Sequence, residues 1–238
     1  MGVTLVALEI DAADPARLAA FWAELLGRTA DPGGTRLLRR SETDFEVWFV
    51  RTELPRTGLH RMHADLTSSS ADDQRHTVKL ALRLGARHLD VGQRGDEGHV
   101  VLADPEGNEF CVIEADNQFL ANTARIGGMA GDGTRLVGEF WSAALHWPLV
   151  WDHEQETAIQ SPAGGTKLTW GGPPVNPKHA RNRLRWVLAA DHDLDAEIGR
   201  LRDLGAPVLT ATAERAELAD PDGNEFVVQP PARRPPAH

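Results

Sequence analysis

Disulfides, tyrosine and long apolar runs are all missing from this chain. Its 238 residues include one cysteine, Cys111, so no intramolecular bridge can form, which excludes an extracellular disulfide scaffold. No apolar run approaches the roughly 20 residues that a membrane-spanning helix needs. The N-terminal residues also lack the basic region and cleavage site of a secretory signal. We therefore expect a cytoplasmic protein with no membrane partner.

Basic residues are in the minority. There are 25 Lys and Arg against 35 Asp and Glu, which gives a formal net charge of −10. No basic stripe with interleaved aromatic residues offsets this charge, so we expect no nucleic-acid partner. The aromatic residues comprise seven Trp, seven Phe and no Tyr. Such a set suits either apolar cores or an apolar ligand, and composition alone does not distinguish the two.

One stretch of sequence occurs twice. Residues 102–113 are LADPEGNEFCVI and residues 218–229 are LADPDGNEFVVQ. In the first copy, Asp104 can accept hydrogen bonds from the backbone of a tight turn, and the glycine and asparagine that follow tolerate positive φ. Each copy therefore predicts a β-hairpin.

A repeat near half the chain length indicates two domains. We expect an N-terminal domain over residues 1–115, which would hold the ligand site, and a diverged C-terminal domain over 124–230. Residues 116–123 are the expected linker, and 231–238 a disordered tail.

Each half contains, twice, a strand followed by a helix and further strands. In the first helix, Asp14 is the expected N-cap, Pro15 occupies the first helical position and Gly27 ends the helix. Its apolar face includes Trp22, for which Trp141 is the counterpart in the second half.

Three motifs together resemble the vicinal oxygen chelate superfamily, and within it the tandem glyoxalase-like and bleomycin-resistance-like proteins. They are D-P-x-x-L-x-x-F-W-x-x-L-L-G (Asp14–Gly27), R-M-H-A-D-L (Arg61–Leu66) and the D-P-E-G-N-E-F hairpin. The resemblance implies an α+β fold of two tandem glyoxalase/bleomycin-resistance-type domains. Each domain would pair two βαβββ-like modules in a half-barrel around a cavity. The superfamily contains lyases, isomerases, dioxygenases and binding proteins, so the fold does not select an activity.

Alternation along the strands separates two faces of each sheet. The apolar face, expected beneath the helices, includes Val6, Leu8, Ile10, Val47, Phe49, Met62, Leu66, Phe110 and Val112. The resemblance directs the other face to the cavity, although a water-facing sheet would show the same pattern. The ligand-binding candidates on that face are Glu9, Trp48, Arg61, Glu109 and Cys111.

In metal-using relatives, the ligands lie on the first and last strands of each module. The corresponding positions are Ala7, Glu46, His63 and Cys111, and Ala7 offers no donor. The other three could hold one divalent metal such as zinc or nickel. A lone cysteine is more often a small buried hydrophobe, and a strand histidine near Asp65 is more often simply hydrogen-bonded. Absence of a metal is the favoured alternative.

The second half has no such ligand set. Its equivalent positions are Ile126, Lys167, Arg185 and Val227, and none of them binds a metal at neutral pH. Lys167 and Arg185 could instead hold a carboxylate or a phosphate. We therefore expect the working site in the N-terminal half.

The leading functional hypothesis is a lyase or isomerase acting on a small molecule. His63 would be the general acid or base, with Glu46 or Asp65 to orient it, Arg61 to meet negative charge and Trp48 to stack on the substrate. Oxygen activation is disfavoured because it would need a complete iron triad, commonly two histidines and one carboxylate, and the complete set is missing. The alternative is a binding protein that sequesters an aromatic or antibiotic-like ligand. Both a monomer and a homodimer remain open.

Overall fold

The structure is a computed structural model that describes residues 2–58, 60–94 and 97–231. The predicted disordered tail, 231–238, lies outside the described residues except for its first position. No helix in the described ranges is long and apolar enough to cross a membrane.

The chain forms four consecutive modules, each with one helix. Module 1 contains β1 (Val3–Ala12), α1 (Pro15–Leu26), β2 (Arg36–Leu37) and β3 (Glu46–Arg51). Module 2 contains β4 (Met62–Leu66), α2 (Ala71–Arg83), β5 (Arg87–His88), β6 (Val100–Ala103) and β7 (Glu109–Val112). Module 3 contains β8 (Ile126–Gly131), α3 (Arg135–Leu145), β9 (Leu149–His153), β10 (Glu156–Gln160) and β11 (Lys167–Trp170). Module 4 contains β12 (Leu184–Ala190), α4 (Leu194–Asp203), β13 (Val208–Ala211), β14 (Ala216–Ala219) and β15 (Glu225–Gln229).

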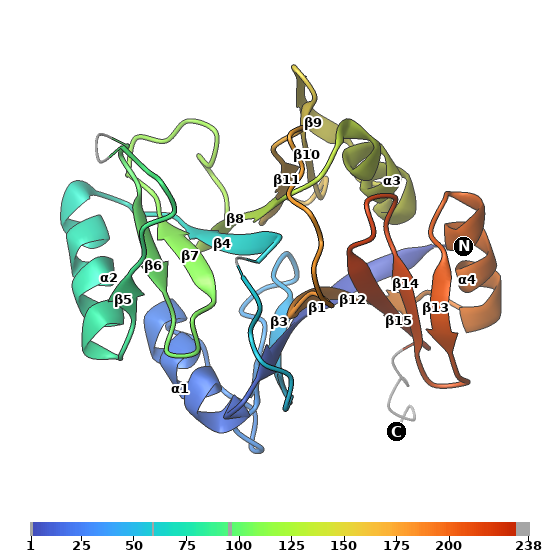
Figure 1. Cartoon of the computed structure of the whole chain (residues 1–238), viewed down its shortest axis with the longest axis horizontal. Helices are drawn as coiled ribbons and strands as arrows, with labels where there is room; N and C mark the ends of the chain where they lie inside the picture. The colour runs from blue at the N-terminus through green and yellow to red at the C-terminus, as the bar shows by residue number, and fades with distance from the viewer. Residues whose placement is uncertain (1, 59, 95–96, 232–238) are drawn as a thin grey trace.

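The strands form two mixed sheets, so the predicted α+β architecture is confirmed (Figure 1). Sheet A has seven strands in the order β13-β14-β15-β12-β1-β3-β2. Sheet B has eight strands in the order β5-β6-β7-β4-β8-β11-β10-β9.

Each sheet joins the two halves of the sequence. In sheet A, β1 runs antiparallel to β12, with Leu8 opposite Trp186. In sheet B, β4 runs antiparallel to β8, with His63 opposite Ala130. The expectation that both modules of one half share a half-barrel is therefore wrong, because module 1 pairs with module 4 and module 2 with module 3. Whether residues 1–115 form a folding unit of their own stays a prediction.

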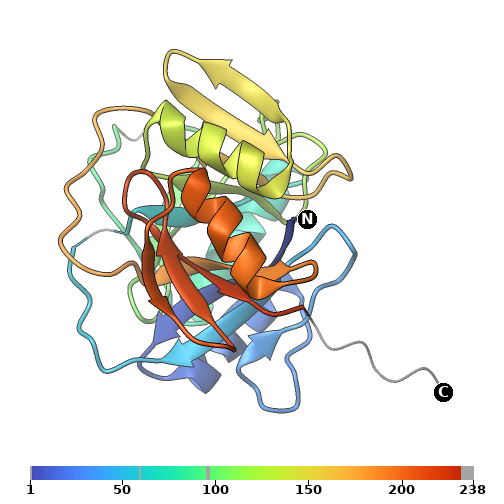
Figure 2. The same cartoon turned by 90° about the vertical axis from the view of Figure 1, so that its right-hand side faces the viewer.

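The helix ends follow the local sequence signals. Asp14 caps α1 by accepting a hydrogen bond from the Arg17 backbone N–H, Pro15 is the first helical residue, and Gly27 takes the left-handed conformation that ends the helix. The helices also contact each other within each half. In the second half, Arg200 of α4 donates to the Ala144 carbonyl of α3 at 2.9 Å, and Figure 2 shows the two helices next to each other.

The predicted apolar faces pack into one core beneath the helices. Its strand members include Leu8, Ile10, Val47, Phe49, Leu66, Phe110 and Val112, with Met62 packed against them. Val6 is the exception. A bulge between Leu5 and Ala7 shifts the β1 register, and Val6 packs with Ala7 on the opposite face.

The repeated hairpin is tied to the helix that begins its own half. Trp22 on α1 donates its indole N–H to the Asp104 carboxylate at 3.1 Å. The same carboxylate accepts the Asn108 backbone N–H at 2.9 Å, as the turn sequence predicts. The Trp22 and Phe110 rings pack edge to face with centroids 5.1 Å apart. The motif therefore joins one module to the next.

The second half contains an equivalent hydrogen bond from a tryptophan to an aspartate, so the same substitution can be compared in both halves. Trp141 donates to Asp220 at 3.4 Å, compared with 3.1 Å in the first copy. We expect Trp22→Phe to lower the free energy of unfolding by about 1–3 kcal/mol, because Asp104 stays buried with one donor fewer. Trp141→Phe should cost less, since its bond is longer. Urea denaturation followed by circular dichroism measures both, and a larger loss in Trp141→Phe would contradict this account.

Candidate functional site

A cavity of about 1150 Å³ lies against sheet B. Both halves of the chain line it: His63 and Cys111 come from module 2, whereas Ala130, Lys167 and Trp170 come from module 3. The cavity is therefore shared between the halves and is not confined to the N-terminal half as expected.

The cross-strand register places the side chains on the cavity floor. Asp65 on β4 lies opposite Cys111 on β7 and Gly128 on β8. Gly128 in turn lies opposite Lys167 on β11. Gly128 itself does not line the cavity, because the Asp65 carboxylate and the Leu120 side chain cover it. Ala130, opposite His63, does line the cavity and presents only a methyl group, so the floor is open beside His63.

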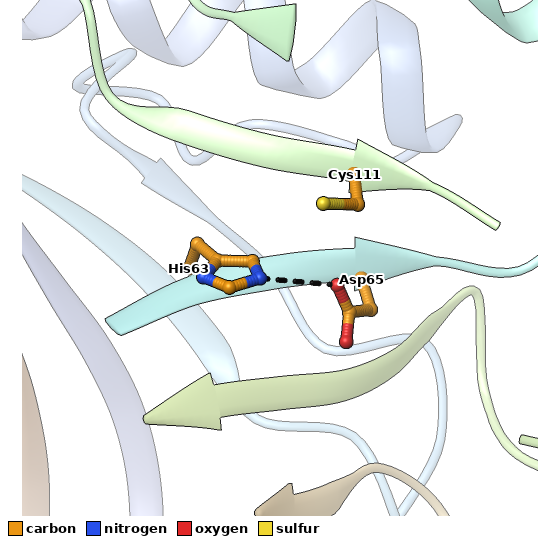
Figure 3. Close-up of side chains that lie close together, drawn as sticks. All are labelled: His63, Asp65 and Cys111. Carbon is orange, nitrogen blue, oxygen red and sulfur yellow. Dashed lines mark ion pairs between the residues drawn. The ribbon is translucent and has the colours of Figure 1, made fainter. Parts of the chain in front are cut away.

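His63, Asp65 and Cys111 form a compact cluster at one side of this floor (Figure 3). Their donor atoms lie within 4.8 Å of one another, and His63 Nε2 is 3.4 Å from Asp65 Oδ1. Burial lowers the pKa of His63, but the hydrogen bonds to Asp65 and Cys111 outweigh it and raise the pKa to about 10. At neutral pH His63 is therefore an imidazolium ion, which can donate a proton or hold an anion but does not act as a base.

The cluster offers an imidazole nitrogen, a carboxylate oxygen and a sulfur atom. Zinc binds all three donor types, so the residues fit a three-ligand zinc centre with its fourth position open to the cavity. In the described part of the facing strand β8, Gly128 and Ala130 provide no further donor. Asp65 thus takes the place that the sequence assigned to Glu46.

Glu46 and Trp48 lie outside this cluster. Both belong to β3 of sheet A, where Trp48 donates its indole N–H to Glu46 at 2.7 Å. The expectation that Glu46 shares a metal with His63, or orients it, is therefore wrong, because β3 pairs with β1 and not with a strand of sheet B. For the same reason Trp48 cannot stack on a ligand beside His63.

Charged side chains fill the corresponding face of sheet A. Arg185 on β12 is 1% exposed, and its Nη2 lies 2.6 Å from both Glu9 and Asp11. Arg215 also pairs with Glu9 at 2.8 Å, and Arg181 with Asp11 at 3.3 Å. The expectation that Arg185 and Glu9 bind a ligand is corrected here, because they bind each other.

Arg61 and Glu109 line the sheet B cavity, but protein partners hold both. Glu109 pairs with Arg56 and lies 3.7 Å from His60 Nε2. Arg61 lies 3.8 Å from an oxygen of Asp132. Their charges are therefore compensated within the protein.

An aromatic wall from the linker and module 3 completes the cavity, and the sequence analysis did not identify it. Phe119 and Trp151 pack edge to face with centroids 6.0 Å apart, and Trp170 lies on β11. His60 also lines the cavity and was missed. The abundance of tryptophan was the available signal, but it does not indicate which half supplies the wall.

The fold and the paired half-barrel sheets define a protein of the vicinal oxygen chelate superfamily. Residues 7–113 and 130–229 match the model of a glyoxalase-like domain, and the chain belongs to that family.

The chain is similar to solved structures of other proteins. Glyoxalase I from Zea mays aligns with a TM-score of 0.66 at 14% identity, covering 96% of this chain and 92% of that chain. A glyoxalase/bleomycin resistance protein/dioxygenase family enzyme from Burkholderia phytofirmans PsJN aligns over 44% of this chain and 94% of its own, at 16% identity and a TM-score of 0.37. No curated protein matches the chain significantly. At these identities the likeness to glyoxalase I shows the fold alone.

The buried ion pairs of sheet A predict that substitution of Arg185 has a large effect on stability. Replacing Arg185 by Met leaves Glu9 and Asp11 with only the more exposed Arg215 and Arg181 as cations, so we expect the free energy of unfolding to fall by about 3 kcal/mol, the lower end of the range for a broken buried ion pair. His63→Met, at the equivalent position of sheet B, is the matched control and should cost less, because His63 and Asp65 are both partly exposed and solvent screens the charge that remains on Asp65. Similar losses in the two variants, measured by urea denaturation, would argue against a structural role specific to Arg185.

The raised pKa of His63 predicts a pH-dependent stability. Its folded-state pKa of about 10 exceeds the ordinary value of 6.5. The charged imidazole therefore stabilises the fold fully below pH 6.5, and this contribution is lost as the pH rises towards 10. We expect the difference in unfolding free energy between the native protein and His63→Gln to shrink over this range, with EDTA present in both samples. A difference that stays constant with pH would refute the ion pair.

Proposed function

We propose that this protein binds a small organic molecule in the sheet B cavity and sequesters it without chemistry. The cavity itself supports this most directly. Ligand sites typically enclose about 300–1,000 Å³ and combine apolar walls with a few placed polar groups. Here Phe119, Trp151 and Trp170 provide apolar surface beside His63 and Lys167.

The chemistry of the floor favours binding over proton abstraction. As an imidazolium ion, His63 lacks the free lone pair that a general base needs. Glu109, the buried carboxylate in the lining, is already paired with Arg56. The facing strand β8 contributes Ala130 to the lining, opposite His63, and this side chain offers no reactive group.

A lyase or isomerase reaction is the second candidate, and the cluster of His63, Asp65 and Cys111 favours it. In this reaction His63 would donate its proton to a substrate oxygen while Asp65 holds the ring in place. If the three side chains held a zinc ion instead, His63 would be a ligand and not the acid, and the metal would supply Lewis-acid polarisation of a substrate carbonyl.

Binding and turnover can be measured on the same compounds. We expect aromatic ligands to quench the protein's tryptophan fluorescence, and Trp151→Ala to weaken binding by about tenfold or more, equivalent to about 1.4 kcal/mol. Trp48→Ala, in sheet A, is the matched control and should leave the affinity unchanged. Equal affinities in the two variants would place the ligand elsewhere.

Mass spectrometry of the recovered ligand separates the two candidates. An unchanged ligand supports sequestration. Conversion that is lost in His63→Ala supports the enzyme, and elemental analysis of protein purified without chelator then shows whether a metal accompanies it.

A further inference from the structure

Lys167 carries an uncompensated positive charge in the sheet B cavity. Its Nζ donates to the Phe119 carbonyl and lies 4.5 Å from the centroid of the Phe119 ring. No carboxylate within the described residues pairs with it, whereas Arg61, the other Lys or Arg of the lining, lies beside Asp132. Burial lowers the pKa of Lys167 without an opposing acidic neighbour. An anion from outside the protein would complete this site.

The apolar side chains beside Lys167 are also incompletely covered. Phe119 is 36% exposed and Trp151 is 44% exposed, although both are large aromatic residues that line the cavity. Val91 and Val150, also in the lining, are each 44% exposed. Contiguous exposed apolar surface around a hollow typically marks a binding site. A flat apolar body would cover these groups.

One acidic residue of the lining, Glu156, is exposed and requires separate consideration. It lies at the opposite end of the β10–β11 pair, because Gln160 is opposite Lys167 whereas Thr157 is opposite Trp170. Glu156 is four residues from Gln160, and four residues along a strand span about 13 Å. Glu156 therefore does not neutralise Lys167, and the charged end of the cavity remains positive.

On the basis of the proposed function, we infer that the ligand class is an aromatic carboxylate. Its ring packs against Phe119 and Trp151, and its carboxylate accepts a hydrogen bond from Lys167 Nζ. Lysine suits this role as a mobile point charge at a partly open site. Ala130, a small lining residue opposite His63, leaves room for the ring system to extend towards His63.

Matched probes that differ in charge alone test this inference. Isothermal titration calorimetry would compare 2-naphthoate with its neutral analogue 2-naphthamide on the full chain. We expect the carboxylate to bind at least tenfold more tightly, and Lys167→Met to abolish this preference while leaving amide binding intact. Lys167→Arg should retain it, and Glu156→Gln, which removes a charge at the far end, should not reduce it.

The possible failures are distinguishable. Equal binding of the two probes, with both weakened by Trp151→Ala, would overturn the carboxylate inference and leave the proposed aromatic site standing. A preference that survives Lys167→Met would also overturn it. Failure of both probes to bind the native protein, or binding that is insensitive to Trp151→Ala, would count against the proposed site as well.

Discussion

The hydrogen bond from a helix tryptophan to a hairpin aspartate is the constraint on which the site depends. Trp22 and Asp104 are both buried, and they fix the turn that leads into β7. Because β7 pairs with β4, the position of this turn determines whether Cys111 lies beside Asp65. The repeat is conspicuous in the sequence for this reason: the DPxGN turn needs an aspartate for its own backbone and for the indole of the preceding module.

The two sheets are built from the same kind of module, but one carries paired buried charges where the other has an open cavity. Arg185 and His63 occupy equivalent positions, but a buried guanidinium requires carboxylates around it, and Glu9 and Asp11 meet that requirement. Their side chains pair over this face of sheet A, and the cavity beside Asp11 is smaller than that of sheet B, at about 450 Å³. His63 is smaller and keeps a single close carboxylate, Asp65, so the hollow of sheet B stays open.

Local signals in the sequence predicted local structure well. The Asp14 cap, the Gly27 helix end, both hairpins and the burial of alternate strand residues all depend on neighbours within a few positions. The pairing of modules could not be predicted, because the first strand of each module has an edge that could pair with any other first strand. For the same reason the partnership of Arg185 with Glu9, 176 residues away, was not foreseeable. Asp65 was a candidate for orienting His63. Only the structure shows that Asp65, and not Glu46, supplies the carboxylate beside His63 and Cys111.

Because the modules pair across the halves, modules 2 and 3 contribute different kinds of side chain to the cavity. Module 2 supplies the reactive cluster around His63, and module 3 supplies shape, aromatic surface and the free charge of Lys167. A chelate centre shared between modules needs donor atoms on both β4 and β8. Glycine and alanine on β8 supply no such donors, and the methyl group of Ala130 leaves space beside His63. The small residues of β8 are therefore one physical reason why we propose recognition for this cavity.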